Sequence, residues 1–80
     1  MYFVYVLYSS KHKRFYKGFT KDLELRLKQH NTGTVKSTKA YIPWEIVYTE
    51  EYLTLNEAVN RERYLKTAAG RRFLKEKFKN

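Results

Sequence analysis

The segment Tyr2–Tyr8 constrains the fold more than any other part of this chain, because it is apolar on both sides. Its sequence, YFVYVLY, is rich in aromatic and β-branched residues and predicts a β-strand. Alternate residues of a strand face opposite sides, so Tyr5 faces one side and Val4 and Val6 the other. A strand of this kind is typically central and covered on both faces. We therefore expect structure on both sides of it.

Two further segments have strand character. Arg14–Phe19 follows the first strand after the polar segment Ser9–Lys13, which fits a hairpin loop. Gly18 is unusual inside a strand, because glycine weakens a strand unless something approaches its backbone closely. A bulge or bend at Gly18 is the alternative. Trp44–Thr49 alternates and contains β-branched residues, so it predicts a third strand.

The segment Thr20–His30 predicts the first helix, with Thr20 as its N-cap and an acidic residue in its first turn. This helix should fade at Asn31–Gly33. The following segment, Thr34–Pro43, is basic, polar and longer than most loops. It is either a binding loop or a plain linker.

The remainder of the chain predicts two more helices. Thr54 and Glu57 form a capping-box pattern that opens a helix over Thr54–Ala69, and Gly70 should end it. Arg71–Lys79 predicts a short, strongly basic last helix. The expected order is ββαβαα, an α+β fold with a three-stranded, at least partly antiparallel sheet flanked by helices.

Both longer helices carry polar residues on their apolar faces. Arg26 and His30 fall on the leucine stripe of the first helix, because residues three and four apart share a face. Glu62 lies between Ala58 and Leu65 on the apolar stripe of the second helix. Burying an unpaired charge is costly. We therefore expect the arginine, the histidine and the glutamate to meet at a shared site.

Each of these residues also has an ordinary structural interpretation. Glu62 suits a ligand of a hard cation such as Mg²⁺, but it could instead pair with a nearby arginine or lysine. Arg26 could clamp a phosphate or form a salt bridge. His30 could contact a phosphate, transfer a proton or be structural. Tyr5 and Tyr16 would be near neighbours in a tight hairpin, either facing nucleic acid or packed in the core.

The charge of the chain favours a polyanionic partner. Its 80 residues hold 17 Lys+Arg against 8 Asp+Glu, a formal net charge of +9. Nucleic acid is the leading candidate, ahead of an anionic membrane surface and of a merely basic protein without such a partner. The candidate nucleic-acid contacts are Lys36, Lys39, Lys66, Arg71, Arg72 and Lys75.

Several classes of protein do not fit the sequence. There is no cysteine, which removes disulfides and thiolate metal sites and fits a reducing compartment. No apolar run approaches the roughly 20 residues of a membrane span. There is no P-loop or GxGxxG motif, so no small-molecule cofactor is expected. We expect one cytoplasmic domain over residues 1–80 without a membrane partner.

Taken in order, these residues resemble the signature of the GIY-YIG nuclease superfamily. Phe3-Val4-Tyr5 and Tyr16-Lys17-Gly18 are similar to the two tripeptides that name it. Family members place an arginine ten residues after the second tyrosine, as Arg26 is here, and many place a histidine one turn later, as His30 is. The family pattern on a later helix is matched by Ala58, Glu62 and Lys66.

The resemblance covers nearly the whole chain and is greatest to small stand-alone bacterial proteins of the excinuclease-like type. It implies a GIY-YIG domain that hydrolyses DNA phosphodiester bonds, in repair or processing, with a divalent metal. Glu62 would bind Mg²⁺ or Mn²⁺ and Arg26 would stabilise the transition state. Tyr5, favoured over Tyr16, would activate water, and His30 would assist at the phosphate or help the base.

Two positions depart from the fullest family pattern. Phe19 stands where many members have a lysine, and Leu74 where some have an asparagine. A catalytically weak or inactive nucleic-acid-binding module on the same scaffold is therefore the alternative function. A basic adaptor for a protein partner is a third.

Overall fold

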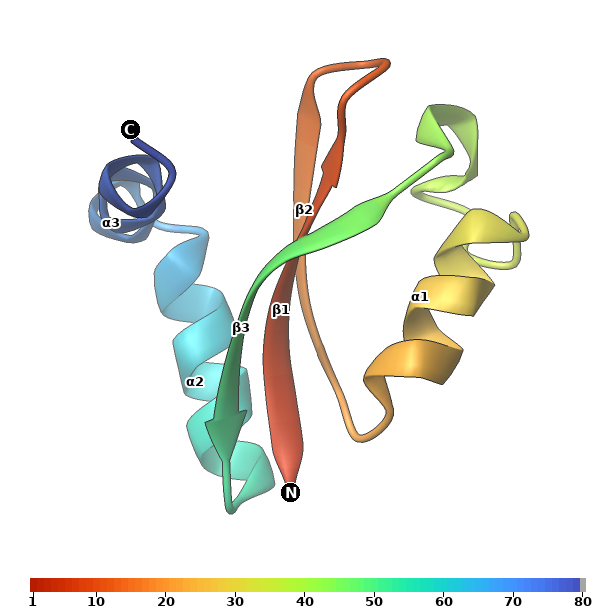
Figure 1. Cartoon of the computed structure of the whole chain (residues 1–80). Helices are drawn as coiled ribbons and strands as arrows, with labels where there is room; N and C mark the ends of the chain where they lie inside the picture. The colour runs from red at the N-terminus through yellow and green to blue at the C-terminus, as the bar shows by residue number, and fades with distance from the viewer. Residues whose placement is uncertain (80) are drawn as a thin grey trace.

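The computed structural model describes residues 1–79. Figure 1 shows a small sheet with helices on both sides. The elements are β1 (Tyr2–Ser9), β2 (Arg14–Thr20), α1 (Leu23–Asn31), the 3-10 turn η1 (Lys39–Tyr41), β3 (Glu45–Tyr52), α2 (Leu55–Leu65) and α3 (Ala68–Lys77). The predicted α+β order ββαβαα is confirmed, with the short turn η1 as an addition. None of the helices among residues 1–79 is long and apolar enough to cross a membrane.

The sheet has the strand order β2-β1-β3, and both pairs are antiparallel. The first strand is therefore central, as its two apolar faces predict. The third strand extends to Tyr52, three residues beyond the predicted end at Thr49. Within residues 1–79, β2 and β3 form the two edges of the sheet.

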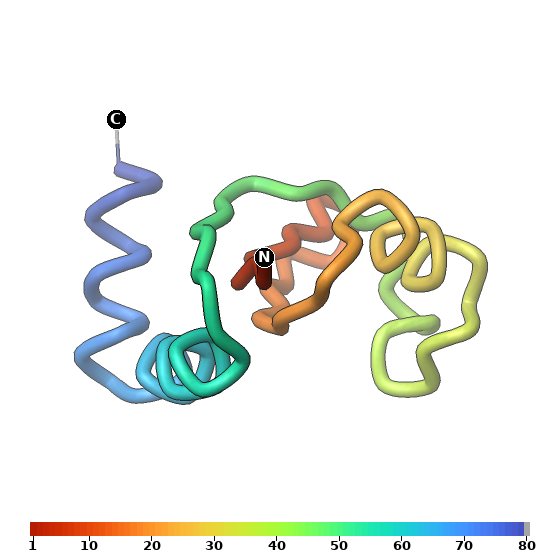
Figure 2. Tube along the Cα trace, turned by 90° about the horizontal axis from the view of Figure 1, so that it is seen from below, coloured from red at the N-terminus to blue at the C-terminus, as the bar shows by residue number. Residues whose placement is uncertain are grey.

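Each face of β1 packs against its own core. On one face, Val4 and Val6 form a buried cluster with residues of α2 and α3. On the other face, Tyr5, Leu7 and Trp44 are buried, and leucines of α1 pack against them. Figure 2 shows α1 and the pair α2–α3 on opposite sides of the sheet. A strand with one polar face could not be covered in this way.

The end of α1 is fastened to the start of β3 by one side chain. Asn31 Nδ2 donates to the carbonyl oxygen of Trp44 at 2.9 Å, and the Trp44 N–H donates to Asn31 Oδ1 at 2.6 Å. The amide thus imitates a strand partner for Trp44. This pairing fixes the helix that carries Arg26 and His30 relative to the sheet.

The predicted start of the first helix is wrong. Thr20 belongs to β2, and the N-cap is Asp22, whose Oδ1 accepts a hydrogen bond from the Leu25 N–H at 3.1 Å. The predicted end of this helix is confirmed, because Thr32 is its C-cap and Gly33 follows at φ +82°. A carboxylate cap is favoured here because it also faces the positive end of the helix dipole.

The capping box at Thr54 is confirmed, but the predicted end of that helix at Gly70 is wrong. The helix α2 already ends at Leu65, and a new helix, α3, begins at Ala68. Thr67 is the N-cap of α3, and its side chain accepts a hydrogen bond from the Gly70 N–H at 3.2 Å. Gly70 lies inside α3, where a Cβ would collide with the carbonyl oxygen of Tyr64. This glycine is therefore required by the close approach of α2 and α3.

Candidate active site

Tyr5 projects from the central strand toward α1, next to Gly18 of β2. The two residues pair directly across β1 and β2. A Cβ on Gly18 would lie 2.5 Å from Tyr5 Oη. The sheet register of this pair is regular, so close approach by Tyr5, and not a bulge, accounts for the glycine.

Tyr5 lies against two side chains of α1. Arg26 Nε donates to Tyr5 Oη at 3.3 Å, and Arg26 Nη1 donates to Gln29 Oε1 at 3.1 Å. His30 Nε2 lies 3.0 Å from Tyr5 Oη. His30 is completely buried, whereas Arg26 is half-buried. The helical spacing that places Arg26 and His30 on one face thus brings both to a single phenol.

A fourth residue, Thr38, completes a row of hydrogen bonds. Its Oγ1 lies 2.8 Å from His30 Nδ1 and 3.4 Å from the carbonyl oxygen of Val35. Thr38 is buried in the loop before η1, and its own carbonyl oxygen accepts from Trp44 Nε1 at 3.0 Å. The loop after α1 is therefore anchored to the site and is not a plain linker.

The donors in this row fix the tautomer of His30. Arg26 can only donate, so Tyr5 Oη accepts from it and keeps its own proton for His30. Thr38 Oγ1 donates to the carbonyl oxygen of Val35, so it accepts from His30 Nδ1–H, and Nε2 of the neutral ring is the acceptor from Tyr5. Every member of the row is satisfied in this single arrangement.

Burial keeps Tyr5 and His30 neutral near pH 7. Desolvation, together with the positive charge of Arg26, lowers the pKa of His30 to about 4. Burial raises the pKa of Tyr5 above its ordinary value, although the hydrogen bond from Arg26 opposes the rise. At rest the shared proton therefore stays on Tyr5, and His30 Nε2 keeps its lone pair.

Tyr16 lies beside this row. Its ring centroid is 6.4 Å from that of Tyr5 and 5.0 Å from that of His30. The two tyrosines are therefore near neighbours, as predicted. They are diagonal and not directly opposite across the strand pair, because the residue opposite Tyr16 is Leu7. Tyr5 and, less strongly, Tyr16 raise the pKa of the Arg26 guanidinium. Tyr16 is also more exposed than Tyr5.

Glu62 is not a member of the row of hydrogen bonds around Tyr5. It comes from α2, on the opposite face of the sheet, and its ion-pair partner within residues 1–79 is Lys66, whose Nζ lies 2.9 Å from Oε2. The negative charge of Glu62 is still among the causes that raise the pKa of Tyr5, so the two groups are within electrostatic reach. The Lys66 side chain is 55% exposed, so solvent reaches this ion pair.

The six candidate nucleic-acid contacts are all exposed, and they form two groups. Lys36 and Lys39 lie in and near the loop that carries Thr38, on the side of α1. The other four lie at the end of α2 and on α3, across the sheet in Figure 1. Leu74, at the position of the family asparagine, is 4% exposed and belongs to the core cluster of Val4 and Val6.

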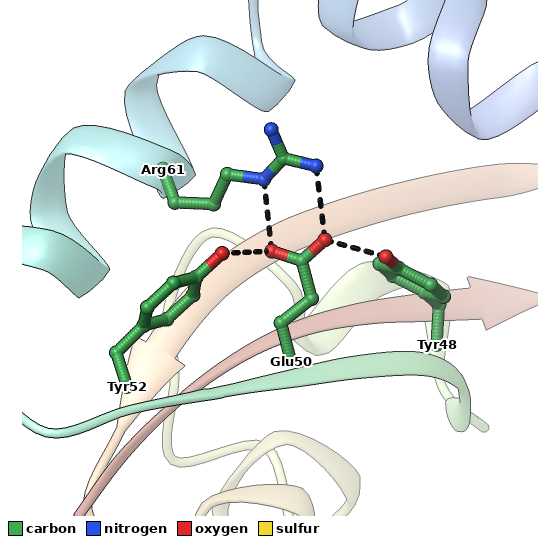
Figure 3. Close-up of polar contacts among 4 residues, drawn as sticks. All are labelled: Tyr48, Glu50, Tyr52 and Arg61. Atoms are coloured by element: carbon green, nitrogen blue, oxygen red, sulfur yellow. Dashed lines mark hydrogen bonds and ion pairs between the residues drawn. The ribbon is translucent and has the colours of Figure 1, made fainter.

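A second polar cluster was missed by the sequence reasoning. Figure 3 shows Glu50 of β3 accepting hydrogen bonds from three side chains. Arg61 donates through Nε and Nη2 at 2.8 and 3.0 Å, and Tyr48 and Tyr52 donate at 2.5 and 2.7 Å. Tyr48, Glu50 and Tyr52 are two residues apart, so they share one face of a strand. A predicted strand that continued past Thr49 would have indicated this cluster.

These four side chains satisfy one another. Burial alone would raise the pKa of Glu50, but the hydrogen bonds from Arg61 and the two tyrosines outweigh it, and the pKa lies below its ordinary value. Burial, together with the hydrogen bond to the same carboxylate, raises the pKa of Tyr52 to about 12. Both oxygens of Glu50 accept hydrogen bonds, so the cluster fastens α2 to the sheet and is not a free ligand set.

The fold and the cluster around Tyr5 match a known family. The family model described as the GIY-YIG catalytic domain matches residues 1–77. This chain therefore belongs to the GIY-YIG family, a family of nucleases, as the resemblance predicts.

Similar proteins carry the name UPF0213. A UPF0213 protein of Staphylococcus epidermidis is 39% identical over 75 residues, which cover 92% of this chain and 90% of the relative. UPF0213 protein YazA of Bacillus subtilis is 39% identical over 66 residues, or 81% of this chain and 66% of the relative. The solution NMR structure of a UPF0213 protein from Bacillus halodurans is 28% identical, with a TM-score of 0.56 and coverage of 98% of this chain and 86% of that one.

Proposed function

We propose that this chain is a divalent-metal-dependent endonuclease that hydrolyses phosphodiester bonds in DNA, in repair or processing. The observation that carries the proposal is the row of hydrogen bonds from Arg26 through Tyr5 and His30 to Thr38. It joins a cation suited to phosphate, a phenol and a neutral imidazole in one place. Membership of a nuclease family supports the same reaction.

Arg26 is the phosphate-binding group in this proposal. Tyr5 and Gln29 hold its guanidinium through Nε and Nη1, and its half-buried position leaves other N–H groups at the surface. A guanidinium held in this way can stabilise the negative charge that builds up on a pentavalent phosphorus. Tyr16, beside it, is the group that orients the water or the phosphate.

Tyr5 and His30 act together as the base. The attacking water gives its proton to Tyr5 Oη as Tyr5 gives its own proton to His30 Nε2, and the resulting hydroxide attacks the phosphorus. The ester oxygen leaves as an alkoxide and takes a proton from solvent, and His30 then returns its proton through Tyr5 to solvent. The low pKa of His30 means that this transfer is concerted, because a separate phenolate and imidazolium would be too unfavourable. His30 is buried with both nitrogens engaged, so of its two expected roles we retain help to the base.

Glu62 is the residue that would hold the metal. No group of three or more His, Cys, Asp or Glu side chains that could hold an ion gathers among residues 1–79, and Glu62 is the one protein ligand that we assign. That is enough for Mg²⁺ or Mn²⁺ in a nuclease, because Mg²⁺ keeps several waters and is held by few carboxylates together with substrate phosphates. Bound there, the cation would supply Lewis-acid stabilisation of the phosphate oxygens.

DNA is the substrate that the charge supports. The net charge of +9 and the exposed cations on both sides of the sheet would attract the phosphate backbone without reading bases. The two groups of cations flank the sheet that bears the phenols. A strand bound by both groups would be held across the site.

The test is nicking of supercoiled and branched DNA by the purified protein, with Mg²⁺ or Mn²⁺ and with a chelator. We expect cleavage with metal and none with the chelator. Binding without cleavage at any metal concentration would contradict the proposal and favour a binding module. An Arg26→Ala protein prepared in parallel is the control, since equal cleavage by it would reveal a contaminating nuclease.

A further inference from the structure

One hollow of the structure lies away from the phenols. It lies between β2 and α3, on the other face of the sheet, and measures about 360 Å³. A volume of this size is in the range of small-molecule sites. It is lined by Phe15, Lys17, Arg71, Leu74, Lys75 and Phe78.

The walls of this hollow are aromatic and open to solvent. Phe15 is 49% exposed, although it is a large apolar side chain on a strand. Its ring lies parallel to that of Phe78, at 5.5 Å between centroids and 5° between planes. Leu74 closes the hollow from the core. A flat apolar group would gain contact here that water cannot supply.

The rim of the hollow is positive. The ion pairs among residues 1–79 are Arg61–Glu50 and Lys66–Glu62, so Lys17, Arg71 and Lys75 have no carboxylate partner there. Burial and the charges of Arg71 and Lys66 lower the pKa of Lys17. Like charges gathered around an apolar hollow favour a ligand that joins a flat apolar group to an anion.

We propose that this hollow binds an unpaired nucleobase of a single-stranded segment, with the adjoining phosphates on the cations Lys17, Arg71 and Lys75. Nucleic acid alone repeats a planar base next to a phosphate, and aromatic side chains bind bases of any sequence by stacking. A base inside a duplex would first have to leave its stack, which costs a few kcal/mol. The inference rests on the proposed function, because it names the form of DNA that the site accepts.

The position of the hollow connects it to the candidate active site. Tyr16 and Gly18 of β2 lie next to Tyr5 in the candidate active site, while Phe15 and Lys17 of the same strand line the hollow. Because β2 is an edge of the sheet, a strand of DNA that crosses this edge meets both places. The bound base would then set which phosphate reaches Arg26.

The experiment measures binding in the presence of a chelator, so that cleavage plays no part. The probes are a fluorescent ten-nucleotide oligothymidylate and an abasic sugar-phosphate chain of the same length and charge. We expect the wild type to prefer the probe with bases by about five-fold to a hundred-fold, the range for stacking of one base on an aromatic ring. Phe15→Ala should reduce this preference to about one without changing affinity for the abasic chain.

Phe19→Ala is the matched control, because Phe19 is a 37% exposed phenylalanine of the same strand that does not line the hollow. It should keep the preference. Phe15→Leu retains apolar volume but removes the ring face, so it should also lose the preference, even if Phe15→Ala folds poorly. Equal affinity of the wild type for the two probes, or no binding of either, overturns the proposal.

Three further outcomes are distinct. Tighter binding of an acidic tyrosine-containing peptide than of oligothymidylate would assign the hollow to a protein partner and overturn the proposal. Base-dependent binding by a protein that never cleaves DNA would support the hollow as a base site while the endonuclease proposal fails. Cleavage with no preference for the probe with bases would leave the endonuclease standing and remove the base site.

Discussion

The hydroxyl group of Tyr5 occupies the space that a side chain of Gly18 would fill. A Cβ on Gly18 would lie 2.5 Å from Tyr5 Oη and 2.7 Å from Tyr5 Cζ. The glycine therefore positions the phenol against Arg26 and His30, at 3.3 and 3.0 Å. The glycine of the second family tripeptide and the tyrosine of the first are thus one structural unit.

Substitution Gly18→Ala should displace the Tyr5 ring. We expect a loss of about 1–3 kcal/mol in the free energy of unfolding, the usual cost of overpacking. Cleavage should fall by about 100-fold, because a displacement of about 1 Å in a catalytic group can cost that much. Denaturant unfolding and single-turnover cleavage measure the two effects. A Gly18→Ala protein with wild-type stability and rate would show that the contact has no consequence.

Thr38→Val should impair the reaction without removing any group that touches DNA. The valine keeps the volume of the threonine but leaves the Nδ1–H of buried His30 without its acceptor. We expect about 1–3 kcal/mol of lost stability and a cleavage rate lower by roughly tenfold or more. Nitrogen-15 NMR of the His30 ring should report the Nδ1–H tautomer in the wild type and a mixture in the variant. Thr38→Ser should restore both rate and tautomer, whereas equal loss in both variants would indicate a packing role only.

His30 should make stability depend on pH. Its pKa is about 4 in the folded chain and about 6.5 when unfolded, so the unfolded state binds more protons between these values. Stability should therefore fall as the pH drops from about 6.5 to about 4, by about 3 kcal/mol in total. The difference in unfolding free energy between the wild type and His30→Gln, measured over this range, isolates the histidine from the carboxylates. A constant difference would mean that His30 is not held neutral by burial.

Glu50 and Glu62 should respond oppositely to the same substitution. Both side chains are 14% exposed and each has a cationic partner, which makes them a matched pair. Glu50→Gln weakens four hydrogen bonds, two of which join α2 to the sheet through Arg61, and should cost about 1–3 kcal/mol of stability with cleavage retained. Glu62→Gln should change stability by less than about 1 kcal/mol, because its partner Lys66 is 55% exposed and solvent weakens the ion pair. Thermal unfolding of both variants distinguishes them, and a large loss of stability in Glu62→Gln would make this residue structural.

The fold was predictable because its main signals are local. The apolar faces of β1 are visible in seven consecutive residues, and the capping box at Thr54 lies within four. The errors arose where tertiary contact decided the outcome. Gly70 has the sequence signature of a helix end, but the carbonyl of Tyr64 lies against it in α3.

The candidate site was predictable to the extent that helical spacing and strand pairing bring residues together. Arg26 and His30 share a face of α1, and Tyr5 and Tyr16 share a hairpin. Thr38 was not predictable, because nothing in a polar loop indicates which hydroxyl will be buried against a histidine. The choice of Lys66 as the ion-pair partner of Glu62 was equally hidden, since helical spacing alone left several cations open as partners.

The most direct test compares the cleavage rate and the DNA affinity of Glu62→Gln with those of the wild type, on one oligonucleotide and with Mg²⁺ present. If Glu62 holds the metal beside Tyr5 and Arg26, the rate should fall by about 100-fold or more while the dissociation constant changes by less than about twofold. A Glu62→Gln protein that cleaves as fast as the wild type would contradict the account of this site.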